Sequence, residues 1–64
     1  MTTSTPTAAI ALKGGDIIRL GRRSVEVFDT APAALLGATA VRYVTPTGVK
    51  TTVLDDDAVV ARLN

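Results

Sequence analysis

The sequence contains no cysteine and no histidine, and these two absences remove several classes of chemistry at once. Without cysteine the chain forms no disulfide, offers no thiolate nucleophile and lacks the usual ligand of structural zinc. Without histidine it lacks the imidazole that serves as a general base near neutral pH and as the commonest metal ligand. We therefore expect no metal site and no cofactor, and the lack of cysteine is compatible with a reducing compartment.

Aromatic residues are nearly as scarce, since Phe28 and Tyr43 are the only two and tryptophan is absent. The remaining reactive side chains are scattered carboxylates, hydroxyls, lysines and one phenol, with no catalytic constellation among them. A chain of 64 residues buries only about 60% of the surface that its unfolded form exposes, so it has little capacity to desolvate a cleft. We expect a protein that is not an enzyme and takes no small-molecule substrate.

Long apolar runs are also missing. No stretch approaches the roughly 20 residues of a membrane span, and residues 1–7 lack the basic and apolar regions of a signal peptide. We expect no membrane association, and a location in the cytoplasm or within a particle that is assembled inside the cell. Residues 1–7 consist mainly of threonine, with a serine and a proline, and this composition predicts a flexible N-terminal arm in front of a single domain over residues 8–64.

The net charge of +1 is small but unevenly placed. Residues 1–50 carry six positive and three negative side chains, whereas residues 51–64 carry one positive and three negative side chains. This balance falls short of the strongly basic surface of a dedicated nucleic-acid binder.

The pattern of residues 16–30 is the clearest in the chain and predicts a β-hairpin. Two runs rich in β-branched residues, 17–20 and 24–28, flank a turn over residues 21–23. Because side chains alternate between the two faces of a strand, the predicted inner face consists of Ile18, Leu20, Val25 and Val27. Phe28 falls on the opposite face, and we expect a later segment to cover it.

Further strands are predicted over residues 8–12, 39–44, 49–54 and 58–63. The turn at residues 45–48 has proline in its second position and glycine in its fourth, which is typical of a tight reversal. Residues 30–37 have the Thr30, Pro32 and Gly37 signals of a single helical turn. The consecutive acids Asp55, Asp56 and Asp57 lack the alternate spacing of a calcium loop and predict an acidic turn, with Asp56 or Asp57 capping a short helical turn.

Three stretches together resemble the small SH3-like β-barrels: GDIIRLGRRSVEV at 15–27, TPTGVKTTVL at 45–54 and DDDAVVARL at 55–63. The resemblance spans most of residues 8–63 and implies an all-β fold, a five-stranded SH3-like barrel. Members of that fold serve translation, chromatin reading, RNA binding, peptide binding and phage particles, so the fold alone does not select a function. Peptide-binding SH3 domains use an aromatic groove, which two aromatic residues do not supply.

Two interpretations of function remain. The first is a structural or protein-interaction module, such as an accessory subunit of a phage particle, in which Leu35 and Leu36 of the apolar loop, together with Thr5 and Pro6 of the arm, contact a protein partner or a second copy. These leucines either plug an open end of the barrel or dock on another subunit, and docking would leave at least one facing outward. The alternative is nucleic-acid binding through a hairpin tip with Arg22 and Arg23, supported by Arg19, Arg42 and Lys50.

Overall fold

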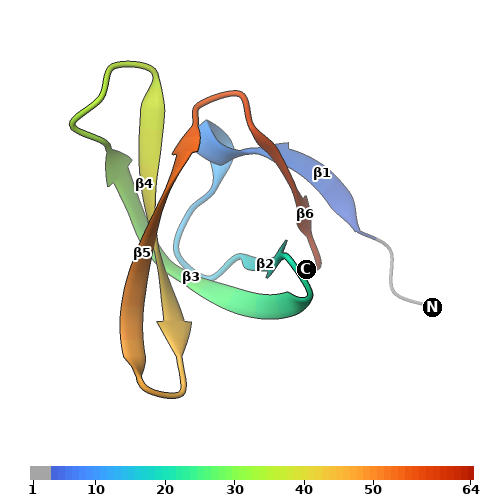
Figure 1. Cartoon of the computed structure of the whole chain (residues 1–64). Coiled ribbons are helices and arrows are strands. Elements are labelled where there is room, and N and C mark those ends of the chain that lie inside the picture. Colours follow the sequence, from blue (N-terminus) through green and yellow to red (C-terminus); the bar gives the residue numbers. More distant parts are fainter. Residues whose placement is uncertain (1–3) are drawn as a thin grey trace.

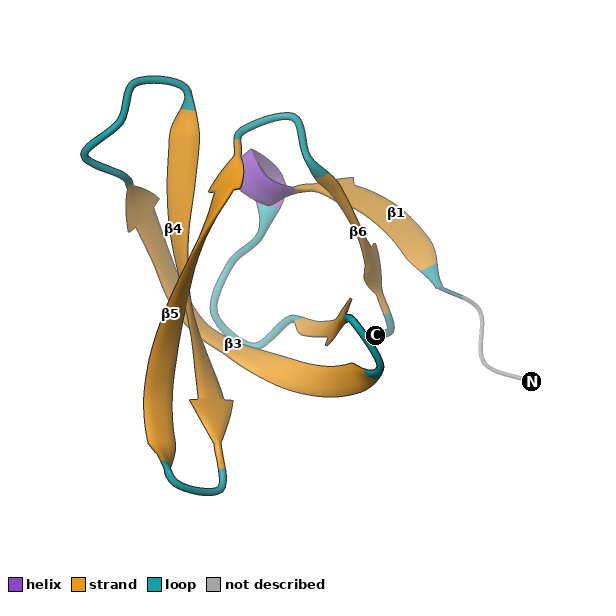
Figure 2. Ribbon diagram, viewed as in Figure 1, coloured by secondary structure: helices purple, strands orange, loops and turns teal. Residues whose placement is uncertain are grey.

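A computed structural model describes residues 4–64, in which six strands form one antiparallel sheet (Figures 1 and 2). The all-β class is confirmed. The elements are β1 (Thr5–Ala8), the 3-10 turn η1 (Ala9–Ala11), β2 (Ile17–Leu20), β3 (Arg23–Pro32), β4 (Ala38–Thr45), β5 (Gly48–Asp55) and β6 (Val59–Arg62).

The spatial order of the strands is β1-β6-β2-β3-β4-β5, so consecutive strands from β2 to β5 form a meander. The long strand β3 bends across the molecule and belongs to both halves of the sheet, one with β2 and one with β4 (Figure 1). The sheet is not closed, because within residues 4–64 β1 and β5 form its two edges. The structure therefore has six strands in an open sheet where five in a barrel were predicted.

The predicted central hairpin is confirmed. Residues 17–20 pair with residues 23–26, and Gly21 and Arg22 form the loop between them, with Gly21 at a φ of 61° that glycine adopts without steric cost. Ile18 and Val27 of the predicted inner face are fully buried, while Leu20 and Val25 pack against them. The turn at residues 45–48 also forms as predicted, since Thr45 pairs directly with Gly48.

The N-terminal prediction is corrected in two places. Thr5 and Pro6, expected in a flexible arm, belong to β1 and pair with Arg62 and Ala61 of β6; residues 1–3 of that arm lie outside the described residues. An edge strand tolerates a proline because one side of its backbone needs no partner. Residues 8–12 are not a strand, because the chain leaves the sheet after Ala8 and turns inward to bury Ala9.

The predicted helical turn over residues 30–37 is also wrong. Thr30 and Pro32 continue β3 and pair with Val41 and Thr39 of β4, so pairing with a neighbouring strand overrides the local capping signals. The chain then reverses through residues 33–37, and the amide of Ala33 donates to the carbonyl of Ala38 at 3.0 Å. Asp56 and Asp57 likewise cap no helical turn; they form the turn between β5 and β6.

Phe28 lies on the outer face and is 53% exposed, contrary to the expectation that a later segment covers it. The pairing of β3 with β4 shifts between Val27 and Asp29, so Phe28 is the extra residue of a β-bulge. A bulge sets two residues of one strand against one residue of its partner. Beyond it the alternation of β3 changes phase, and Thr30 rather than Asp29 pairs with the buried Val41.

Residues 13–16 form a turn that is held tightly against β3. The amide of Lys13 donates to the Asp16 carboxylate at 3.1 Å, and the carbonyl of Asp16 accepts from the amide of Val27 at 2.7 Å. A Cβ atom at Gly14 would lie 2.7 Å from the carbonyl oxygen of Phe28, so only glycine fits there without movement of the backbone. On the other side of β2, Asn64 Oδ1 accepts from the amide of Ile17 at 2.9 Å and lengthens the short contact with β6.

The assignment of the core predicts how the free energy of unfolding changes when a buried side chain is shortened. Val27→Ala removes two methyl groups from a fully buried side chain and should lower the free energy of unfolding by about 2–3 kcal/mol, because the burial is lost and a cavity remains. The matched control is Val59→Ala on β6, where the valine is exposed and the loss should stay below about 1 kcal/mol. Urea unfolding followed by circular dichroism measures both; equal losses would contradict the assignment of the core.

Candidate functional site

Three large apolar side chains are exposed at one end of the molecule. Leu35 and Leu36 lie in the loop between β3 and β4, and Ile10 lies in η1. Leu36 is fully exposed, while Leu35 and Ile10 are 72% and 65% exposed. The two leucines therefore do not act as a buried plug, and both remain available to another molecule.

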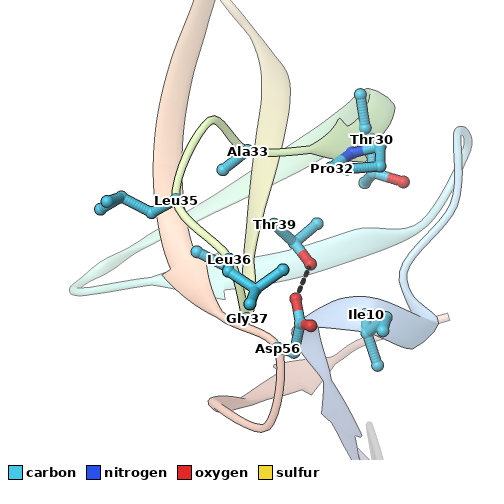
Figure 3. Close-up of a pocket in the computed structure, with 11 residues that line it drawn as sticks. Ile10, Thr30, Pro32, Ala33, Leu35, Leu36, Gly37, Thr39 and Asp56 are labelled. Carbon is cyan, nitrogen blue, oxygen red and sulfur yellow. Dashed lines mark hydrogen bonds between the residues drawn. The ribbon is translucent and has the colours of Figure 1, made fainter.

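A groove of about 340 Å³ lies between these side chains (Figure 3). It is lined by the β3–β4 loop and the adjoining ends of β3 and β4, together with Ile10 of η1 and Asp56 of the β5–β6 turn. Its lining residues are Ile10, Thr30, Ala31, Pro32, Ala33, Leu35, Leu36, Gly37, Ala38, Thr39 and Asp56. We call this region the apolar end.

Asp56 ties together the segments that form the apolar end. Its carboxylate accepts a 2.6 Å hydrogen bond from the hydroxyl of buried Thr39 (Figure 3). Its backbone amide donates to Gly37 at 2.9 Å, and its carbonyl accepts from the amide of Ile10 at 3.1 Å. A charge-assisted hydrogen bond of this kind is stronger than a neutral one. The exposed leucines are thus carried on a loop whose base is fixed, through Asp56 of the β5–β6 turn, to β4 and η1.

The other predicted interface residues are not part of this end. Thr5 and Pro6 are exposed on β1, at the far edge of the sheet, and neither lines the groove. Ile10 is the residue that the sequence reasoning missed. A strand over residues 8–12 would set Ile10 and Leu12 on one face, whereas in the structure Ile10 is exposed on η1 and Leu12, just after η1, is buried.

The five predicted nucleic-acid residues are divided among different surfaces. Arg23 and Lys50 line a second, open groove of about 700 Å³, together with Tyr43, Leu20 and Val25. Arg22 lies in the loop of the β2–β3 hairpin, and neither it nor Arg19 lines this groove. Two of the five cations thus line the same groove as Tyr43. We call this second groove the basic groove.

Arg42 lies on the outer face of β4 and is held by two neighbours from β3. Its Nε donates to Asp29 Oδ1 at 2.6 Å, and its Nη2 group pairs with Oδ2 of the same carboxylate. The guanidinium also lies 5.3 Å from the centre of the Phe28 ring, within the range of a cation–π contact. The β-bulge makes this possible because it sets Phe28 and Asp29 together opposite Arg42.

These contacts shift the pKa values of both ionised groups. The hydrogen bonds from Arg42 stabilise the charged carboxylate and so lower the pKa of Asp29, and the same hydrogen bonds raise the pKa of Arg42. Arg42 is therefore already neutralised by a partner within the chain, which makes it a poor phosphate ligand.

Within residues 4–64, no group of three or more acidic side chains is placed to hold a metal ion. The same part of the chain has no helix that is long and apolar enough to cross a membrane. No protein-family model matches the chain, and comparison with curated proteins and with solved structures found no match. The apolar end and the basic groove are therefore the features of the structure that bear on function.

The contact between Arg42 and Asp29 predicts a change in the pKa of Asp29 when Arg42 is replaced. Arg42→Gln removes the cation, so the pKa of Asp29 should rise toward its ordinary value of about 3.9. Because the pKa is lowered in the folded protein, the pair stabilises the fold above the unfolded pKa, and this contribution is lost as the pH falls through the folded pKa. The effect on stability should be small because the pair is exposed.

An NMR titration of the Asp29 carboxyl carbon in the wild type and the variant measures this change. Lys50→Gln is the control, because Lys50 pairs with Tyr43 on the opposite face of the sheet and should leave Asp29 unaffected. An Asp29 titration curve that is the same with and without Arg42 would contradict the assigned contact.

Proposed function

We propose that this protein is a non-enzymatic interaction module that docks on a protein partner through its apolar end. The observation that carries the proposal is the exposure of both Leu35 and Leu36 beside the groove that contains Ile10. Adjacent large apolar side chains that project into water are characteristic of a surface that becomes covered by another protein. Fixation of the loop base by Asp56 favours docking, because less conformational entropy is then lost on binding.

The side chains of the apolar end also indicate what kind of surface the partner would present. Asp55, the last residue of β5, and Asp57 of the β5–β6 turn flank Asp56, and both are exposed. A complementary surface would provide an apolar pocket for Leu36 and basic side chains around its rim. Such rim charges orient a complex and speed its formation more than they strengthen it.

We propose further that the sheet is an opened SH3-like barrel to which β1 has been added. Five strands in the order β6-β2-β3-β4-β5 support this, since a four-strand meander is followed by a last strand that returns to pair with the first. The two aromatic side chains lie apart, with Tyr43 in the basic groove and Phe28 against Arg42 on the outer face. This separation argues against binding of proline-rich peptides in an aromatic groove.

In this proposal the chain is a small accessory subunit of a larger assembly, in the cytoplasm or in a particle assembled inside the cell, such as a phage particle. The small size of the chain supports the proposal, because a small protein gains stability from binding to a partner. A core of so few buried side chains gives modest stability by itself, and binding to a partner increases it by mass action.

The docking proposal predicts that Leu36→Asp releases the protein from its assembly. Native mass measurement of the wild-type assembly, purified from its source under mild conditions, should show a complex that contains other polypeptides. The variant should be recovered without those polypeptides while its circular dichroism spectrum is unchanged, because Leu36 makes no buried contacts. Val59→Asp, at an exposed valine on β6, is the matched control and should remain bound. Retention of the Leu36 variant in an intact complex would refute the proposal.

A second candidate function is binding of single-stranded nucleic acid, which is favoured by the meeting of Arg23, Lys50 and Tyr43 in one groove. A basic groove with an aromatic platform is the usual arrangement for this ligand. The docking proposal predicts weak binding to a single-stranded oligonucleotide, unchanged in the double variant Arg23→Glu plus Lys50→Glu. Tight binding that weakens steeply with salt, is lost in this variant and persists in Arg19→Glu would instead support the second candidate.

A further inference from the structure

Strand β5 is a long edge of the sheet that the described residues leave uncovered. It pairs with β4 along its whole length, from Gly48 to Asp55, and no strand among the described residues pairs with its other side. The opposite edge, β1, is half as long and contains Pro6, which blocks further pairing. Strand β5 contains neither a proline nor a bulge. An unprotected edge of this kind is a template for pairing with another strand.

The side chains of β5 increase its tendency to pair. Val49 and Val53 lie on the outer face of the sheet and are 49% and 53% exposed. Thr51 lies between them on the same face, and Val44 of the adjacent strand β4 is exposed beside Val49. β-Branched residues are well suited to a strand whose partners cover their sides. The edge therefore combines unpaired backbone groups with apolar side chains that have a cross-strand neighbour on β4 but none on the free side.

The sequence of this edge is complementary to itself. Residues 49–53 read VKTTV, so an antiparallel copy centred on Thr51 sets Val49 against Val53, Thr51 against Thr51 and Lys50 against Thr52. The neighbouring registers are worse. A centre at Lys50 would place two lysines directly opposite each other, and like charges in that position are destabilising. A centre at Thr52 would place Val49 against Asp55.

We infer that β5 pairs antiparallel with β5 of a second copy of this chain, about a two-fold axis at Thr51. The sheet then continues from one copy into the next, and the valines of both outer faces form one surface. A two-fold contact uses the same surface on both copies and closes on itself, so the product is a dimer. The contact involves neither Leu35 nor Leu36, so it extends the docking proposal and can fail or succeed separately.

Disulfide trapping tests the register directly, because the natural chain has no cysteine. Directly opposed residues of an antiparallel pair have Cα atoms about 4.5–5.5 Å apart, which is within the range that a disulfide requires. Under mild oxidation Thr51→Cys should give a covalent dimer at least about tenfold faster than Thr52→Cys, whose equivalents would lie about 8 Å apart in this register. A faster reaction of Thr52→Cys, or equally slow reactions of both variants, would overturn the inferred pairing.

Sedimentation of the cysteine-free protein provides the second measurement. The wild type should show a concentration-dependent equilibrium between monomer and dimer. Val53→Lys should weaken the dimer at least about tenfold, because in each copy the apolar pair of Val53 with Val49 of the other copy would be replaced by a lysine against a valine. Leu36→Asp should leave the dimer unchanged even if it abolishes docking. A wild type that stays monomeric at millimolar concentration would refute self-pairing. The same holds if the backbone amides of β5 are protected only when a different protein is bound.

Discussion

Ile18, Val27 and Val41 are fully buried, and the curl of the sheet around these three side chains is the constraint on which the other features depend. Each comes from a different strand, and Leu12 covers them from the turn that follows η1. A sheet of this size encloses few side chains, while nearly half of the residues are apolar. Several other aliphatic side chains therefore stay exposed. Most of the large ones lie at the apolar end or along β5 and the adjacent Val44, whereas Val59 lies apart on β6.

The local parts of the fold could be predicted from the sequence, and the non-local parts could not. The β2–β3 and β4–β5 hairpins follow from alternating β-branched residues and from glycines at Gly21 and Gly48. Both hairpins and the inner face of the first were predicted correctly, although Arg23 of the first predicted turn belongs to β3. Strand β1 was missed because Thr5, Pro6 and Thr7 show no apolar alternation, and only the presence of β6 makes them a strand. The bulge at Phe28 also has no local signal.

In the candidate site, too, some residues were indicated by the local sequence and others are placed only by the tertiary structure. An apolar segment between two strands was sufficient to indicate Leu35 and Leu36, since exposed loops are normally polar. The groove was not predictable, because Ile10 reaches it only through η1, and Asp56 only through its bond to Thr39. The sequence shows which residues are basic, but it does not show which of them lie on the same surface. A shift of one residue at the bulge decides that Arg42 meets Asp29, and only the pairing of strands brings Arg23 toward Lys50.

The topology of the sheet has a consequence for the order in which the chain folds. From β2 to β5 each strand pairs with the next, so these contacts close short loops, whereas Thr5 pairs with Arg62 across nearly the whole described length. The entropic cost of closing a loop rises with the length of the loop, so contacts between residues that are distant in the sequence form late. The β3–β4–β5 meander is therefore the natural nucleus of the folding reaction. We therefore expect strand β1 to join last and to detach first, while the meander remains intact.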